Sequence, residues 1–288
     1  MLSRVADSVY WLSRYVERAE NVARFIDVND NLTLGESDPL ATQWAPLVYT
    51  TGDQEDFEER YGIPTRENVL KFLSFDEENP NSIISCVASA RENARTIREV
   101  ISSIVWEQLN KFFFMVRSAA QFGVTLEQPQ EFCERVRLAS HLLVGAMDAT
   151  MPHDEAWHFS RLGRLIERAD KTSRIVDVQY YLLLPDPTNV GSQLDVVRWS
   201  ALLKSASALE TYRRIYGKIV PHQVAELLIL DRRFPRSMHF ATIKAQESLR
   251  DISGSDAGTF CHPSEQLLGR LRSSMDYGDI GQIMQHGL

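Results

Sequence analysis

Cysteine is scarce in this sequence: the 288 residues include only Cys86, Cys133 and Cys261. They lie far apart, none belongs to a C-x-x-C motif, and their number is odd, so neither a disulfide framework nor a zinc ribbon is expected. Such a chain suits a reducing compartment, and we expect a cytoplasmic protein.

Long apolar runs and an excess of positive charge are also missing. The runs "FFFMV" (Phe112–Val116) and "YYLLLP" (Tyr180–Pro185) are far shorter than the ~20 apolar residues of a membrane-spanning helix. Charges interrupt the N-terminal stretch every few residues, so no signal peptide is expected. The net charge is −8, which argues against broad binding to nucleic acid or anionic lipid. We expect neither as a partner.

Alternating strand patterns are almost absent, and helical periodicity dominates. The sequence therefore predicts an all-α, multi-helix bundle that forms one domain over residues 1–288. Residues 51–64 are expected to form a short exposed helix or a loop, and residues 251–260 a loop rich in glycine and serine. Helices are predicted at about 3–32, 37–50, 64–74, 80–104, 105–122, 130–149, 153–184, 192–218, 222–231, 235–249 and 263–275.

One charged stretch occurs twice. "SRYVERAENVARFIDV" (Ser13–Val28) and "GRLIERADKTSRIVDV" (Gly163–Val178) match at seven of sixteen positions at an offset of 150. This predicts two pseudo-repeated halves, about 1–150 and 151–288, although helices rich in Ala, Glu and Arg can also match by chance. Pairing "SARENARTIRE" (89–99) with "SALETYRRIYG" (207–217) predicts extra residues around 35–66 in the first half: 72 separate Glu20 from Glu92 and 40 separate Asp170 from Glu210, a difference of 32.

The charges of the repeated stretch fall on one flank of each helix, beside its apolar face. Glu17, Glu20 and Arg24 lie there in the first copy, and Glu167, Asp170 and Arg174 in the second. Such a flank is either a solvated ladder of ion pairs or the acidic side of an internal polar seam.

Two other predicted helices supply partners for such a seam. Glu210 and Arg213 continue the apolar stripe that starts at Trp199, so we expect them to be buried and paired. Arg91, Asn93 and Arg95 lie in "ARENARTIRE", whose arginines are either exposed or meet the repeated acids. Arginine forks hold carboxylates and phosphates, so the seam could also bind an anionic or amino-acid-like ligand.

Most chemical motifs are missing. Glu155 and His158 form an E-x-x-H pair, but a second copy, which a di-metal bundle needs, is not present. The pair therefore remains a weak metal candidate, and we expect no bound metal. A phosphate-binding glycine loop and a G-x-S-x-G motif are absent too, and we expect no cofactor. Cys261 beside His262 is a weak signal for a nucleophile.

The sequence resembles the bacterial alpha-E family. The resemblance is carried by "LSRVADSVYWLSRYVERAENVARFIDV" (2–28), "ARENARTIRE" (90–99), "RLGRLIERADKTSRIVDVQYYLLLP" (161–185) and "VAELLILDRRFPRSMHF" (224–240). Two positions depart from the family pattern: Ile104 replaces a frequent glutamate and Tyr181 a common histidine. Any site that includes these positions would have altered chemistry.

Membership in this family implies a helical protein that occurs beside, or fused to, a circularly permuted ATP-grasp ligase, often with a transglutaminase-like protease. It suggests a role in making or modifying a small peptide or amide, with the ligase chemistry in the partner. The residues leave two alternatives open: a free-standing, possibly metal-dependent enzyme that uses Glu17, Glu20, Glu167, Glu155 and His158, or a structural interaction module. The chain could also form a homo-oligomer.

Overall fold

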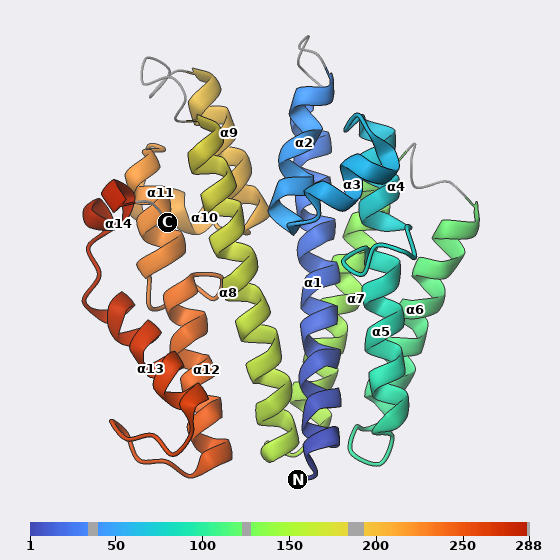
Figure 1. Cartoon of the computed structure of the whole chain (residues 1–288), viewed down its shortest axis with the longest axis vertical. Coiled ribbons are helices and arrows are strands. Elements are labelled where there is room, and N and C mark those ends of the chain that lie inside the picture. The colour runs from blue at the N-terminus through green and yellow to red at the C-terminus, as the bar shows by residue number, and fades with distance from the viewer. Residues whose placement is uncertain (34–39, 123–127, 184–192, 287–288) are drawn as a thin grey trace. The chain divides into compact units, whose positions relative to one another are not determined.

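The computed structural model describes residues 1–33, 40–122, 128–183 and 193–286. Within these ranges it contains fourteen helices and no strand (Figure 1), which confirms the all-α prediction. None of the helices described is long and apolar enough to cross a membrane. The helices are α1 (Ser3–Thr33), α2 (Leu40–Thr51), α3 (Gln54–Tyr61), α4 (Arg66–Ser74), α5 (Ile83–Thr96), α6 (Ser103–Phe122), α7 (Pro129–Thr150), α8 (Glu155–Leu183), α9 (Gln193–Ser205), α10 (Leu209–Tyr216), α11 (Pro221–Leu230), α12 (Met238–Ser253), α13 (Pro263–Asp276) and α14 (Ile280–His286).

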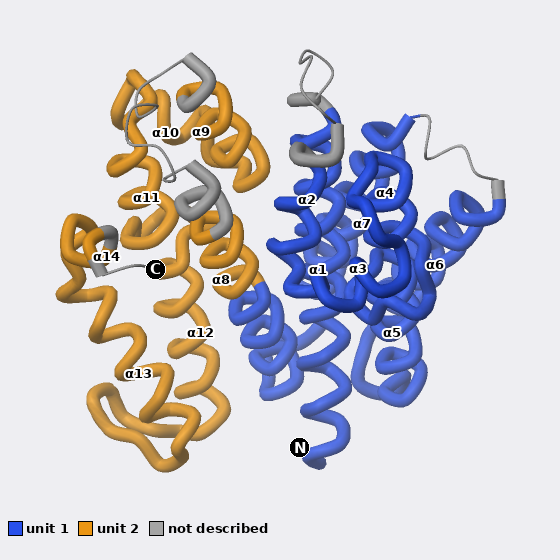
Figure 2. Tube along the Cα trace, turned by 45° about the horizontal axis from the view of Figure 1, so that its top comes forward, with its two compact units in different colours: residues 1–167 blue, residues 168–288 orange. Residues whose placement is uncertain are grey.

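The chain divides into two compact units, Met1–Glu167 and Arg168–Leu288 (Figure 2). The division falls inside α8, which begins in unit 1 and ends in unit 2. Each unit is described by itself below.

Unit 1 is built around α1, which packs against α5 and α7. The apolar side chains of α1, among them Leu12, Val16, Val22 and Ile26, are buried, as the helical spacing of these residues requires. Helix α6 lies against α5 and α7, and α2 and α4 contact α1 near its C-terminal end (Figure 1). Charged residues on the flank of α1 are thereby carried into the interior.

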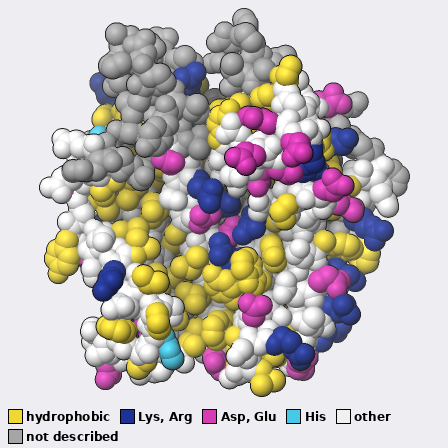
Figure 3. All heavy atoms as spheres, viewed as in Figure 1, with side chains coloured by type: hydrophobic (Ala, Val, Ile, Leu, Met, Phe, Trp, Pro, Cys, Tyr) yellow, Lys and Arg dark blue, Asp and Glu magenta, His cyan; other side chains and the backbone are white. Residues whose placement is uncertain are grey.

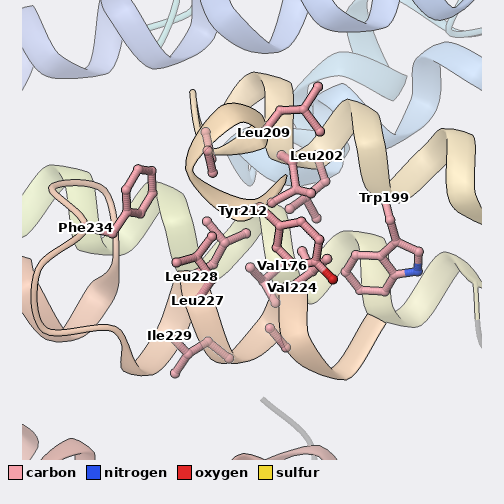
Figure 4. Close-up of a cluster of buried hydrophobic side chains, with 14 of the residues drawn as sticks. Val176, Trp199, Leu202, Leu209, Tyr212, Val224, Leu227, Leu228, Ile229 and Phe234 are labelled. Atoms are coloured by element: carbon pink, nitrogen blue, oxygen red, sulfur yellow. The ribbon is translucent and has the colours of Figure 1, made fainter. Parts of the chain in front are cut away.

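Unit 2 has a hydrophobic core around α9, α10 and α11. Figure 4 shows the Tyr212 ring beside Leu202, Val176 and Val224. Helix α12 packs between α11 and α13. The Tyr212 hydroxyl donates to the carbonyl oxygen of Lys218 at 2.9 Å, so this buried ring still satisfies its polar end.

The structure corrects two predicted helices. The helix expected over 80–104 ends at Thr96, and α6 begins at Ser103. The helix expected over 192–218 is two helices, because the chain breaks after Ser205 and Ser207 adopts a left-handed φ of 51°. Residues 54–61 form a short helix, one of the two forms expected there, and its Phe57 is buried. Helix α14 was not predicted.

The helix bounds allow another alignment of the two halves. Helices α10, α11 and α12 each begin 155 residues after α3, α4 and α5: Leu209 against Gln54, Pro221 against Arg66, and Met238 against Ile83. A constant offset would pair these helices, whereas the expected pairing of 89–99 with 207–217 required 32 extra residues in the first half. The duplication and its alignment both stay predictions.

The turns before α5 and α12 share one arrangement, with the sequence D-x-x-x-P-x-S. Ser82 and Ser237 cap the following helix by accepting an N–H hydrogen bond from the residue three positions on. Each serine hydroxyl also donates back to the carbonyl oxygen of the aspartate that opens the turn, Asp76 or Asp231. The capping serine thus fixes the turn and starts the helix together.

Candidate functional site

The Glu167 carboxylate lies at the contact between α1 and the first part of α8, and its side chain is 0% exposed. Arg14 holds its Oε2 through Nε and Nη2, both at 2.7 Å. Arg18 donates from Nε to Oε1 at 2.7 Å and from Nη2 to Oε2 at 3.1 Å. Two arginine forks therefore enclose one buried acid, which is the arrangement that a buried carboxylate needs.

Arg18 also links this acid to the turn before α5 and to Asp53, the residue before α3. Its Nη1 donates to Asn81 Oδ1 at 2.7 Å, and Asn81 Nδ2 donates to Asp53 Oδ1 at 2.7 Å. Burial by itself lowers the pKa of Arg18, but the hydrogen bonds and charge of Glu167 outweigh it, and the pKa is raised. Arg18 stays charged throughout the physiological range.

A second buried carboxylate, that of Glu20, lies on α1 itself. Arg24 donates to its Oε1 from Nε at 3.0 Å and from Nη2 at 2.8 Å. From α7, the Ser140 hydroxyl donates to Oε2 at 2.7 Å, and His141 Nε2 lies 3.1 Å from Oε1. A buried polar seam therefore lies in unit 1 between α1 and α7, and the arginine that pairs with Glu20 comes from α1 itself, whereas an arginine from another helix was expected.

The seam continues to the C-terminal end of α1. Asp27 pairs with Arg137 of α7 at 3.2 Å. Buried Asp30 accepts a hydrogen bond from Arg66 Nε of α4 at 2.7 Å and another from Gln130 of α7. Acids spaced along one flank of α1 thus tie it to two neighbouring helices.

The equivalent pair in the second copy, Asp170 and Arg174, lies in a different environment. Arg174 Nε is 3.1 Å from Asp170 Oδ1, but the two side chains are 43% and 33% exposed. The neighbouring Lys171 is buried, with Nζ 3.5 Å from Asp170 Oδ2. We therefore do not group Asp170 and Arg174 with the buried seam.

Glu210 and Arg213 are exposed, and the expectation that they would be buried is wrong. The chain turns between Ser205 and Leu209, so the angular count that began at Trp199 does not continue into α10. Glu210 and Arg213 were expected in an internal seam only because residues 192–218 were predicted to form one uninterrupted helix.

The residues of α5 also do not meet the repeated acids. Arg91 Nε donates to Asn110 of α6 at 2.8 Å, and its guanidinium lies 4.8 Å from the Phe113 ring centre. Arg95 pairs with exposed Glu92 on its own helix, and Asn93 donates to the Ser89 carbonyl oxygen. These three side chains face another side of unit 1.

The arginines that enclose Glu167, Arg14 and Arg18, were not predicted as its partners. A signal for them was present, because both are among the seven positions that the two copies share: they match Arg164 and Arg168. The angular argument placed only the acids and looked for their partners on other helices.

A pocket opens in unit 1 between α1, α7 and α8. The space between its side chains, part of it open to solvent, is about 420 Å³. Its polar lining is Ser13, Glu17, Asp148, Ser160, Arg161 and Arg164. The first copy of the repeated acid, Glu17, borders this space.

Two contacts explain how closely α1 and α8 approach beside this pocket. The Ser13 and Ser160 hydroxyl oxygens are 2.7 Å apart. A Cβ atom on Gly163 would lie 2.3 Å from the Tyr10 carbonyl oxygen, so only glycine fits at that position. Under the offset of 150 these two contacts exchange, because Tyr10 matches Ser160 and Ser13 matches Gly163.

The residues considered for a metal do not come together. Glu155 Oε2 lies 2.6 Å from the N-terminal amino group of Met1, and the His158 ring packs edge-on against Trp157. Among the residues that the structure describes, no group of three or more His, Cys, Asp or Glu could hold a metal ion. Of the two departures from the family pattern, Ile104 is exposed on α6, whereas the Tyr181 side chain lies outside the described residues.

Comparison with known proteins gives the same family as the resemblance. A model for the family "Alpha-E", a predicted alpha-helical domain with a conserved ER motif, matches residues 1–288. The chain belongs to the Alpha-E family. Glu-Arg occurs at four places in this Alpha-E chain, and two of them, Glu17–Arg18 and Glu167–Arg168, lie in the two copies of the repeated stretch.

The Alpha-E chain is also similar to longer mycobacterial proteins. It is 23% identical over 274 residues to an uncharacterised protein of Mycobacterium bovis and, to the same extent, to uncharacterised proteins of two Mycobacterium tuberculosis strains. The match covers 89% of this chain and only 30% of the length of each relative. No solved structure matches it significantly.

Proposed function

We propose that this Alpha-E chain is the helical partner of an ATP-grasp amide ligase that builds or modifies a small peptide or amide in the cytoplasm. The family resemblance names the partner class, and the ligase chemistry would belong to that partner. The chain would contribute a docking face and a place for part of the substrate. The observation that carries the docking role is an aromatic and arginine-rich face on α5 and α6.

This α5–α6 face comprises Arg91 of α5, Arg98 of the segment that joins α5 to α6, and Trp106, Phe113 and Phe114 of α6. The Arg98 guanidinium lies 4.3 Å from the Trp106 ring centre, and Arg91 lies 4.8 Å from that of Phe113. Phe114 is 56% exposed. Tryptophan and arginine, preformed into stacked pairs and beside an exposed ring, are the composition typical of the centre of a protein interface.

The surroundings of the face also support docking. Ile104 adds an exposed apolar side chain on α6, and an exposed apolar group is favoured where a partner will cover it. Acidic side chains gather over α3 instead, where Glu55, Asp56, Glu58 and Glu59 are exposed (Figure 3). The α5–α6 face is therefore the better candidate for an apolar and aromatic contact.

The test is a binding measurement with an ATP-grasp protein encoded by the same genome, produced separately. We expect Arg98→Ala and Phe114→Ala each to weaken binding, raising the dissociation constant by about tenfold or more. Lys111→Ala is the matched control: Lys111 is exposed on the same helix and pairs only with its helical neighbour Glu107 among the contacts described. Absence of a complex, or equal affinities for all three variants, would contradict the proposal.

A further inference from the structure

We infer that the exposed side of α7 is a contact between two copies of this chain, which pair their α7 helices antiparallel about a twofold axis. The contact is centred on a stripe of exposed residues, here called the α7 stripe: Arg135, Leu138, Leu142, Gly145 and Ala149. None of them belongs to the α5–α6 face, so the inference does not depend on the proposed ATP-grasp partner.

The α7 stripe has the spacing of a helix–helix contact. Its members recur at intervals of three, four, three and four residues, which places them along one side of the helix. Leu138 and Leu142 are 58% and 56% exposed. The other side of α7, which includes Val136 and Leu143, is buried, and α7 packs against α1 and α6. The helix is therefore apolar on two sides, and the described chain covers one of them.

The stripe fits a second copy of itself when the two helices run antiparallel. With the twofold axis level with Ser140, Leu138 faces Leu142 of the other copy, and Arg135 faces Gly145. A long side chain then lies opposite open space, because nothing lies within 4 Å of the Cβ position of Gly145. A twofold contact requires each such pair to occur twice with the roles exchanged. The order of residues in the stripe meets this requirement, which a contact with an unrelated protein does not impose.

The charges beside the stripe are also complementary in this arrangement. Arg135 is exposed and forms no ion pair with the residues that the structure describes. Asp148 of the other copy lies about one turn beyond the Gly145 that Arg135 faces. Its side chain is 66% exposed, and His153 Nε2 is 3.7 Å away, which is too far for a hydrogen bond. Glu134 is exposed next to Arg135, so the guanidinium would lie between two carboxylates.

The size of the contact indicates a weak dimer. The 22 residues of α7 form a helix about 33 Å long and about 10 Å wide, which offers roughly 330 Å² to a partner. A stable interface covers about 800 Å² on each partner. We therefore expect a dissociation constant of about 10–100 μM.

Sedimentation equilibrium of the whole chain tests the dimer directly. Between about 5 and 500 μM, the average mass should rise from that of one chain, 32.9 kDa, towards twice that value. Leu138→Glu should raise the dissociation constant about 100-fold or more, because the changed contact occurs twice in each dimer.

A leucine of unit 2 provides the matched control. Leu267 is 65% exposed on α13, and Leu267→Glu should associate as the unchanged chain does. Circular dichroism shows whether each variant folds. If Leu138→Glu does not fold, Leu142→Glu takes its place, with the same expected loss of association.

An exchange of charges tests the antiparallel pairing. Arg135→Glu should weaken association about tenfold, and adding Asp148→Lys should restore it to within about threefold. The two positions are 13 residues apart on one helix, or about 20 Å, so one can compensate for the other only between copies. Arg135→Glu combined with Glu59→Lys has the same net charge, with the second change exposed on α3, and should stay weak.

Three results would overturn the inference. The first is the mass of a single chain throughout the concentration range. The second is equal association of folded Leu138→Glu, or its substitute Leu142→Glu, and Leu267→Glu, which would move any dimer contact to another face. The third is a failure of Asp148→Lys to restore Arg135→Glu better than Glu59→Lys does, which would exclude the antiparallel pairing.

Discussion

The two copies of the repeated stretch contain the same intrahelical ion pair in two different environments. In the first copy, Arg24 and Glu20 are 6% and 1% exposed, and Ser140 and His141 of α7 complete the contacts of the acid. In the second copy, Arg174 and Asp170 are 43% and 33% exposed. The local sequence therefore determines that the pair forms, and the neighbouring helix determines how much the pair contributes to stability.

The first glutamate of each copy, Glu17 or Glu167, also differs in its surroundings. Glu167 is enclosed by two arginines of α1, which suits a structural role. Glu17 is also buried and borders the pocket. The two glutamates therefore share burial and differ in the surroundings that the rest of the structure provides.

The largest effect is expected from Glu167→Gln. This change removes the negative charge between Arg14 and Arg18, and breaking a buried pair in this way costs about 3–5 kcal/mol of the free energy of unfolding. Urea denaturation measures it. Glu107→Gln, at the exposed pair with Lys111, is the control and should cost under about 0.5 kcal/mol. Similar midpoints for the two variants would mean that the Glu167 cluster contributes little to stability.

A matched pair of variants tests the comparison directly. Arg24→Ala should lower the free energy of unfolding by about 2–3 kcal/mol, because the buried Glu20 carboxylate loses the positive charge that pairs with it. Arg174→Ala should lower it by under about 0.5 kcal/mol, because its pair is half-exposed. Denaturation of both proteins under one condition gives the difference, and equal losses would show that burial does not separate the copies.

Alanine substitutions at two helical glycines should change the stability of the protein in opposite directions. Gly163→Ala would place a methyl group against the Tyr10 carbonyl oxygen and should destabilise the protein by about 1–3 kcal/mol. Gly145 of α7 has nothing within 4 Å of its position for a Cβ atom, so Gly145→Ala should stabilise the helix by about 0.5–1 kcal/mol. Thermal melts distinguish them; a stabilised Gly163→Ala would rule out the close approach of α1 and α8.

Glu265 extends the comparison of buried acids to one whose described partners are hydroxyl and backbone N–H groups, in place of arginine. It accepts hydrogen bonds from the hydroxyls of Ser253 and Ser255 and from the N–H groups of Cys261 and His262, and these lower its pKa to about 2. Since the folded pKa lies below the usual value of 4.5, its stabilising effect is present above pH 4.5 and is lost as the pH falls towards 2.

The expected effect of Glu265 is small and local, at the N-terminal end of α13. Hydrogen exchange of the α13 amides should increase between pH 4.5 and 2 in the unchanged protein. In Glu265→Gln the same exchange should already be fast at pH 5, after correction for intrinsic rates. An unchanged pH profile in the variant would show that another group controls this helix end.

Much of the fold could be predicted from the sequence because the helices have strong apolar periodicity. Helix α1 was expected over 3–32 and runs from Ser3 to Thr33. The break around Ser207, which has a φ of 51°, could not be predicted, since the residues there include neither glycine nor proline, the types that usually mark a helix break. That missed break is what placed Glu210 and Arg213 wrongly.

The candidate site was predictable only in part. The flank of α1 gave Glu17, Glu20 and Arg24 correctly as residues beside the core, because their angles follow from helix geometry. The partners of the acids could not be derived in this way, since tertiary packing brings Ser140 and His141 of α7 to Glu20, and Arg14 and Arg18 to Glu167. Sequence spacing specifies a face of one helix, and it does not specify which helix covers that face.

The paired turns before α5 and α12 have a consequence for how the chain folds. Each is closed by a hydrogen bond between residues six positions apart, from Ser82 to Asp76 and from Ser237 to Asp231, and contacts so local form with little loss of loop entropy. Each turn joins two helices that both belong to one unit. We expect the helical hairpins α4–α5 and α11–α12 to be two early and independent starting points for folding, one in each unit.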